Sequence, residues 1–322
     1  MAVYTRVSAE ALTAFLAGYD VGTLVSAKGI AEGVENSNYL VETTQGRFIL
    51  TLYEKRVRAE ELPFFLALTD HLAAKGLPVP PAIRDRKGEA IQQLCGRAAC
   101  LITFLPGVAL SHPTPAQAEA AGDVLGAMHR ALADFSLSRP NAMGQPSWQA
   151  LYERCGASLE TIAPGLHHDL GEAIGQLATS WDRDGLDRGV IHADLFPDNL
   201  LMLGDRVTGV IDFYFACTDI RLYDLAVMDT SWAFDAGGTR YDPAIAAALK
   251  RGYARHFAPS DADDVAFADL CVGACIRFTL SRAWDWLNTP ADALVTRKDP
   301  LAYWRRIATY APDLARRLPT LR

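Results

Sequence analysis

Residues 191–213 constrain the fold of this chain more than any other part of it. The segment opens with the string His-Ala-Asp, whose acid is Asp194, and continues to Asn199 and then to Asp212. Apolar residues lead into the string and into Asp212, a pattern typical of short strands that end in polar loops. Phosphoryl transfer from ATP requires one carboxylate to orient the attacking hydroxyl, and an amide and a second carboxylate to hold Mg²⁺. The spacing therefore predicts Asp194 as the base, with Asn199 and Asp212 as metal ligands.

Composition and charge narrow the classes of partner. The net charge of −7 and the lack of a Lys/Arg block argue against a nucleic-acid surface. The longest apolar run, 98–110, is too short to span a bilayer, and Pro106 interrupts it. Of the six cysteines, Cys271 and Cys275 lie in an apolar helical stretch, so we expect them in a core. The first residues lack the pattern of a signal peptide. We expect a cytoplasmic protein with a small-molecule substrate; the sequence does not indicate an oligomeric state.

The texture of the sequence changes near Pro106 and Gly107. Alternating runs before this point predict strands, interrupted by one helix over 59–75. After it, Thr114 and Gln117 form a capping-box pattern that predicts a helix to about residue 131. The expected strands are 38–43, 47–53, 89–94, 97–104, 189–192, 200–203 and 207–211, and further helices are expected near 148–160, 167–182, 222–234, 243–256, 261–287 and 300–317.

This arrangement resembles the protein-kinase-like fold in its aminoglycoside-phosphotransferase and choline-kinase branch. Within that branch the sequence motifs are most similar to those of the homoserine kinase family. The segments that carry the resemblance are 29–39, 48–55, 192–199 and 209–217.

The resemblance implies an α+β fold with two lobes. A small antiparallel β-rich N-lobe over 1–104 would bind the nucleotide. Residues 105–107 would form the hinge. A larger, mostly helical C-lobe over 108–322 would hold the catalytic and acceptor-binding residues. ATP and Mg²⁺ are the cofactors that the resemblance implies.

Residues 29–38 are expected to form the loop over the nucleotide. Gly33 would let the backbone approach the phosphates, and Asn36, Ser37 and Asn38 would supply side-chain donors. A polar hairpin without a ligand is the alternative interpretation of the same pattern.

The strand over 48–53 departs from the kinase pattern. Thr51 stands where a phosphate-binding lysine is expected. Side chains alternate along a strand, so Lys55 shares a face with Thr51 and is a candidate substitute. Glu60 or Glu61 is its candidate partner, and a solvated lysine at a strand end is the alternative.

The resemblance also assigns supporting roles. Thr103 and Phe104 lie in the strand whose main chain would bond adenine. His192 and Asp224 would support the catalytic loop, with Asp224 bonded to backbone near His192. Phe196 stands where many members of the branch have a second histidine, which weakens an interpretation as an aminoglycoside-modifying enzyme.

A homoserine acceptor carries a carboxylate, which the fork of an arginine binds in a bidentate way. Arg277 and Arg282 lie in an apolar helical stretch and are the candidates, whereas Asp219 or Asp285 could bind the ammonium. A kinase for choline, an aminoglycoside or hydroxylysine remains an alternative, and so does a binding protein without turnover.

Overall fold

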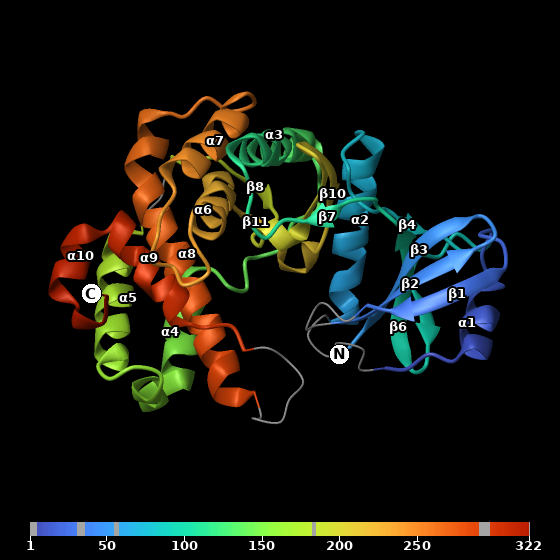
Figure 1. The fold of residues 1–322 in the computed structure, drawn as a ribbon, viewed down its shortest axis with the longest axis horizontal. Coiled ribbons are helices and arrows are strands. Elements are labelled where there is room, and N and C mark those ends of the chain that lie inside the picture. The colour runs from blue at the N-terminus through green and yellow to red at the C-terminus, as the bar shows by residue number, and fades with distance from the viewer. Residues whose placement is uncertain (1–4, 31–35, 55–57, 182–184, 290–296, 322) are drawn as a thin grey trace. The chain divides into compact units, whose positions relative to one another are not determined.

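The computed structural model describes residues 5–30, 36–54, 58–181, 185–289 and 297–321 (Figure 1). The chain forms two compact units. The smaller comprises Met1–Gly107 and Thr208–Tyr214, and the larger comprises Val108–Val207 and Phe215–Arg322. We expected 208–214 in the larger lobe, but its contacts place it with the smaller unit. The assignment of nucleotide and acceptor binding to separate lobes stays a prediction.

The smaller unit is built on an antiparallel sheet with the strand order β1-β2-β3-β6-β4, and β5 pairs with β6. Alternating apolar side chains of the central strands make its core, with Val41, Leu50 and Leu101 fully buried. The strands are β1 (Leu24–Gly29), β2 (Asn36–Thr43), β3 (Gly46–Tyr53), β4 (Ala82–Ile83), β5 (Gln92–Leu94) and β6 (Arg97–Thr103), and the helices are α1 (Ala9–Leu16) and α2 (Leu62–Ala74).

Helix α1 and strand β1 were not predicted from the sequence. Ser8 caps α1 by accepting the N–H of Ala11, and the helix buries Leu12 and Leu16 in the same core as the sheet. The helix is only 8 residues long, so its pattern is too brief to stand out before the packing partner is known.

The larger unit is mostly helical. Its helices are α3 (Pro115–Ala131), α4 (Gln145–Cys155), α5 (Leu166–Ser180), α6 (Arg221–Trp232), α7 (Pro243–Ala254), α8 (Asp261–Asn288), α9 (Leu301–Tyr310) and α10 (Pro312–Arg317). Both hydrogen bonds of the predicted capping box at Thr114 are present. The single helix expected over 300–317 is wrong: Pro312 begins a new helix, because its ring prevents α9 from continuing. Helix α8 runs through the core and buries both Cys271 and Cys275.

Short strands of the larger unit position the polar loops. Strand β8 (Arg188–Ile191) pairs antiparallel with β11 (Cys217–Ile220), which was not predicted. Strand β7 (Val108–Ala109) pairs with β9 (Leu200–Leu203). The chain returns to the smaller unit along β10 (Arg206–Val210). Residues 192–199 therefore form a loop between β8 and β9. Each of these strands pairs with a different strand, so both ends of the loop are fixed.

Candidate active site

Strand β8 ends in a turn that carries the His-Ala-Asp string. His192 is buried, and Ala193 has a φ of 64°, a left-handed conformation that residues with a Cβ rarely adopt. The carboxylate of Asp224 accepts the N–H of His192 at 2.7 Å and that of Ala193 at 2.6 Å. Because these bonds use both carboxylate oxygens, Asp224 holds the strained turn in one conformation.

The carboxylate of Asp224, on α6, is itself braced by buried groups. His129 Nε2 lies 3.1 Å from Asp224 Oδ2, and His129 Nδ1 lies 3.0 Å from the hydroxyl of Tyr253. Burial alone would raise the pKa of Asp224. The hydrogen bond and charge of His129 and the backbone N–H of His192 outweigh burial and hold this pKa below its usual value. Asp224 is therefore an ionised carboxylate inside the fold.

Sequence reasoning missed His129 and Tyr253. The only local signal was a histidine in the last turn of α3 among apolar residues. Such a histidine is usually a packed core residue, and its partners on α6 and α7 are far away in the sequence. No spacing rule connects these three helices.

Asp194 and Asn199 lie together at the start and end of the loop. The Asn199 amide nitrogen donates to the backbone oxygen of Asp194 at 2.8 Å and lies 3.4 Å from Asp194 Oδ2. The side chain of Asp194 is 15% exposed. These contacts of the amide nitrogen fix the side chain of Asn199, whose amide oxygen is the atom that can act as a metal ligand.

Arg277, one of the two predicted acceptor ligands, reaches this loop from α8. It is 3% exposed. One guanidinium nitrogen donates to the backbone oxygen of Ala193, and the other lies 3.8 Å from Asp194 Oδ1. The structure therefore places Arg277 against the loop backbone and the proposed base.

Arg282, the other candidate, has different surroundings. It is half-buried, its guanidinium lies 4.5 Å from the ring centroid of Tyr303, and it donates to the backbone oxygen of Asp299 at 3.2 Å. Burial lowers its pKa, an effect that the negative charges of Asp299 and Asp194 oppose. Within the described part of the chain, no carboxylate forms an ion pair with Arg282. Arg282 is therefore a partly desolvated cation without a direct carboxylate partner among the described residues.

The candidates for binding an ammonium are less open. Asp219 accepts from Asn141 at 2.7 Å and pairs with Arg188 at 2.9 Å, so both of its oxygens are engaged. Asp285 lies on α8 and also has an interaction within the protein.

Asp212 belongs to the smaller unit and follows β10. It is exposed and has a φ of 66°. The residues after it anchor the segment: Phe213 is buried, and the hydroxyl of Tyr214 lies 3.4 Å from that of Tyr53. Burial raises the pKa of Tyr214, so this pair stays neutral. The anchored neighbours fix the backbone from which the Asp212 carboxylate extends.

The expected nucleotide loop is shorter than predicted. Asn36, Ser37 and Asn38 are the first residues of β2, because pairing with β3 continues to the register Asn36–Tyr53. The hydroxyl of Ser37 donates to Glu54 at 2.7 Å, and the side-chain oxygen of Asn38 accepts from Thr51 at 2.8 Å. These side chains form hydrogen bonds within the smaller unit, and their proposed contacts with the nucleotide stay predictions. Gly33 lies outside the described residues.

The other predicted nucleotide contacts are also partly engaged. Thr51, where a lysine was expected, is 2% exposed. A lysine at this buried position would lose its contact with water, which is costly for a charged group. The N–H and the hydroxyl of Thr103 both donate to the backbone oxygen of Pro81. Phe104 lies outside β6 with the Arg47 guanidinium 4.6 Å from its ring centroid. Lys55 is outside the described residues.

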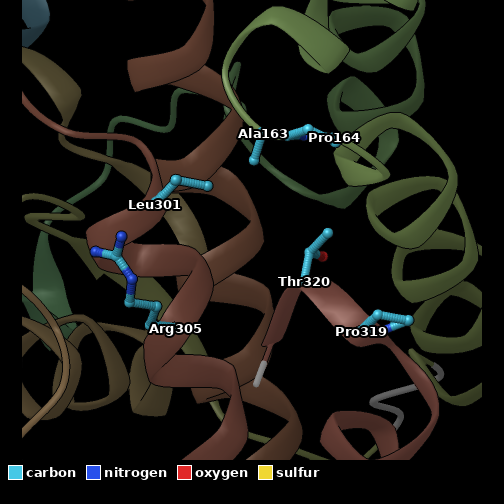
Figure 2. A pocket seen from close by; sticks show the side chains of 6 residues that line it. All are labelled: Ala163, Pro164, Leu301, Arg305, Pro319 and Thr320. Carbon is cyan, nitrogen blue, oxygen red and sulfur yellow. The ribbon is translucent and has the colours of Figure 1, made fainter.

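Among the cavities in the described residues of the larger unit are two that are not lined by Asp194 or Asn199. The smaller, of about 310 Å³, lies between α9 and the C-terminal segment (Figure 2). Arg305, the charged residue of its lining, already bonds Gly237 O and Asp299 at 3.1 Å. The larger, of about 460 Å³, is bounded by α6, α7, α8 and α9 and includes Tyr253.

The described residues contain no cluster of three or more His, Cys, Asp or Glu side chains suited to a metal ion. None of the described helices is long and apolar enough to cross a bilayer.

Comparison with known proteins identifies the chain as a phosphotransferase. The profile of the phosphotransferase enzyme family matches residues 26–259, and the chain belongs to this family. The chain is 50% identical over 308 residues to a homoserine kinase of Gluconobacter oxydans, an alignment that covers 95% of this chain and 97% of the relative. A homoserine kinase of Zymomonas mobilis is also 50% identical, with 96% and 97% covered.

Solved structures support the fold. A structure of an amicoumacin kinase with AMP-PNP and Ca²⁺ superposes with a TM-score of 0.72 at 14% identity, covering 98% of this chain and 95% of the other. A spectinomycin phosphotransferase in complex with ADP has a TM-score of 0.68 at 14% identity, with 98% and 100% covered. These confirm the predicted two-lobed, kinase-like α+β fold.

Proposed function

We propose that this chain transfers the γ-phosphoryl group of ATP to the hydroxyl of L-homoserine, giving O-phospho-L-homoserine and ADP, a step of threonine biosynthesis. The observation that carries the proposal is half identity to homoserine kinases over nearly the whole length of both chains. Asp194, Asn199 and Asp212 follow one another in the order expected for the base and the two metal ligands of phosphoryl transfer. A cytoplasmic location is part of the proposal, and the free thiols of the described cysteines are compatible with it.

Asp194 acts as the base in this proposal. Its carboxylate is partly exposed and held by the bonded loop, so it can accept a hydrogen bond from the acceptor hydroxyl. The hydroxyl oxygen attacks the γ-phosphorus, the bond to the ADP oxygen breaks, and the hydroxyl proton passes to Asp194. Alignment of the hydroxyl is the main contribution of this residue.

The donor set fits Mg²⁺. Asn199 has an amide oxygen on a side chain that is anchored through its nitrogen, and Asp212 has a carboxylate on an exposed residue, which are the ligand types that Mg²⁺ prefers. When bound, Mg²⁺ neutralises phosphate charge as the phosphoryl group moves. Gly33, Asn36, Ser37, Asn38, Lys55, Thr103 and Phe104 are the proposed contacts of the nucleotide.

Arg282 is the better of the two candidates for the acceptor carboxylate. It is a half-buried cation that lacks a carboxylate partner in the described residues, and the charge of Asp194 acts on it. A carboxylate placed on Arg282 would satisfy a desolvated cation within electrostatic range of the base. The hydroxyl end of the same molecule would then face Asp194.

The test is ADP release with Mg-ATP and a panel of L-homoserine, aminopropanol, choline, hydroxylysine and kanamycin. We expect turnover with homoserine, and a fall in kcat of about 10²–10⁴-fold in Asp194→Asn with nucleotide binding retained. Preferential turnover of choline, hydroxylysine or kanamycin would contradict the proposed acceptor. Undiminished turnover in Asp194→Asn would contradict the proposed base.

A further inference from the structure

Arg277 is a charged side chain in the interior of the larger unit. It lies midway along α8, is 3% exposed, and has the rings of Phe278 and Phe215 at 4.3 and 5.2 Å from its guanidinium carbon. A cation enclosed in this way is costly to desolvate unless specific partners compensate. Its partners should therefore indicate what it does.

The hydrogen bond to a backbone oxygen and the ion pair of Arg277 are both made with the loop 192–199, the catalytic loop. One terminal nitrogen donates to the backbone oxygen of Ala193, and the other approaches Asp194 Oδ1 at 3.8 Å, an ion-pair distance longer than a hydrogen bond. Asp224 accepts the N–H of the same Ala193 at 2.6 Å. The residue before Asp194 is thus held at its N–H by a buried anion and at its carbonyl by a buried cation.

This double anchor acts where the backbone is strained. Ala193 has a φ of 64°, which a residue with a Cβ keeps only when its surroundings impose it. If the carbonyl were released, the peptide before Asp194 could rotate and carry the carboxylate away from its position. At 3% exposed, Arg277 offers almost no surface to an acceptor carboxylate, whereas Arg282 on the same helix is half-buried.

We infer that Arg277 is a positioning residue that holds Asp194 in register for phosphoryl transfer, and that the acceptor carboxylate is bound elsewhere, on Arg282. The inference rests on the proposed function for the identity of the acceptor, but the anchoring of the loop does not depend on it.

Arg306 provides a matched control. It is also buried, at 4% exposed, stacks 4.0 Å from the Tyr303 ring centroid, and donates to the backbone oxygens of Thr230 and Asp235. It therefore shares the burial, the aromatic contact and the carbonyl bonds of Arg277, but its bonded carbonyls lie outside the loop 192–199.

The first experiment compares Arg277→Met and Arg306→Met, each alone and combined with Asp194→Asn, in steady-state kinetics with the acceptor that turns over. Arg277→Met should lower kcat by about 100-fold, the cost of an ångström-scale misplacement, while KM for the acceptor changes by less than about threefold. In the Asp194→Asn background it should cost almost nothing more, because the group that it positions is gone. Arg306→Met should have the same effect in both backgrounds.

Two results would overturn the inference. A rise in acceptor KM of about tenfold or more with kcat preserved would make Arg277 an acceptor ligand. An equal loss in both backgrounds would make it a purely structural residue like Arg306. Arg277→Lys should recover part of kcat, since an ammonium keeps the charge but not the fork.

A second measurement is independent of turnover. Hydrogen exchange of residues 190–199 should accelerate by about tenfold or more in Arg277→Met and stay unchanged in Arg282→Met. Unchanged exchange in Arg277→Met would overturn the anchoring. If the wild type does not phosphorylate homoserine, the proposed function fails, whereas this comparison still decides the role of Arg277.

Discussion

Arg277 and Arg282 carry the same charge on the same helix, yet their surroundings give them different chemistry. The first is enclosed by aromatic rings and bonded to the loop, and the second is half-buried over the ring of Tyr303. The sequence made the two equal candidates, because both stand in an apolar helical stretch. The aromatic side chains that make their surroundings different include Phe215 and Tyr303. Both lie outside α8, so the helical pattern of this segment does not reveal them.

Arg282→Met should change acceptor discrimination. Removing a charge-assisted hydrogen-bond donor costs about 1.5–3 kcal/mol, so KM for homoserine should rise roughly 10- to 100-fold. Aminopropanol lacks the carboxylate, so its KM should stay unchanged. The ratio of kcat/KM for the two acceptors is the measurement. An equal effect on both acceptors would show that Arg282 does not bind the carboxylate.

At the scale of the element, helix α6 carries two buried aspartates with opposite protonation behaviour. The pKa of Asp224 is lowered because hydrogen bonds and the charge of His129 outweigh burial. The pKa of Asp229 is raised by burial, although the Tyr310 and Tyr241 hydroxyls donate to its Oδ1; in the described structure its Oδ2 is buried without a hydrogen-bond partner. The helix therefore holds one carboxylate that favours the charged form and one that favours the acid.

These directions predict opposite pH effects on stability. The raised pKa of Asp229 means that its contribution is present below an unfolded pKa of about 3.9 and is lost as pH rises toward the folded value. The free energy of unfolding of Asp229→Asn, relative to wild type, should therefore increase from pH 4 upward. For Asp224→Asn the same difference should decrease as pH rises through the region below about pH 4. Urea unfolding over this range is the measurement, and parallel curves for wild type and both variants would contradict it.

Glycines set the distance between α3 and α7, the helices that supply His129 and Tyr253. A Cβ at Gly252 would lie 2.0 Å from the backbone oxygen of Glu119, and one at Gly122 would lie 2.1 Å from that of Leu249. These neighbours are backbone atoms and cannot rotate away. The close approach of the two helices, which lie side by side in Figure 1, therefore depends on the missing side chains.

Gly252→Ala should destabilise the protein by about 3 kcal/mol despite the better helix propensity of alanine. Gly175→Ala is the matched control, since this exposed glycine of α5 has open space around its Cβ position. That variant should gain about 0.5–1 kcal/mol. Thermal or urea unfolding distinguishes the two signs. Gain or neutrality in Gly252→Ala would show that the helices can separate freely.

At the scale of the whole molecule, the sequence predicted local features better than long-range ones. The capping box at Thr114 and a helix from Asp261 follow from nearby residues, and the structure contains both. The bracing of Asp224 by His129 and Tyr253 joins three helices, so no local rule reveals it. The start of β2 at Asn36 depends in the same way on pairing with β3. The residue types in the sequence thus predicted the class of reaction, whereas the residues that hold the loop 192–199 in place could be identified only from the folded structure.

Nucleotide binding should stabilise the protein only when Mg²⁺ is present. A ligand at 100 times its Kd adds about 2.7 kcal/mol to the free energy of unfolding, which should raise Tm by several degrees for a chain of this size. Chelation of Mg²⁺ with EDTA should abolish most of the shift and all phosphoryl transfer.

Asn199→Ala and Asp212→Ala should reduce the shift because each removes a proposed ligand. Asp194→Asn should retain the shift, since a base that faces the acceptor contributes little to nucleotide affinity. Thermal unfolding with ATP, with and without EDTA, separates these roles. An equal loss in Asp194→Asn and Asn199→Ala would mean that the two residues hold the nucleotide together and that the division between base and metal ligand is wrong.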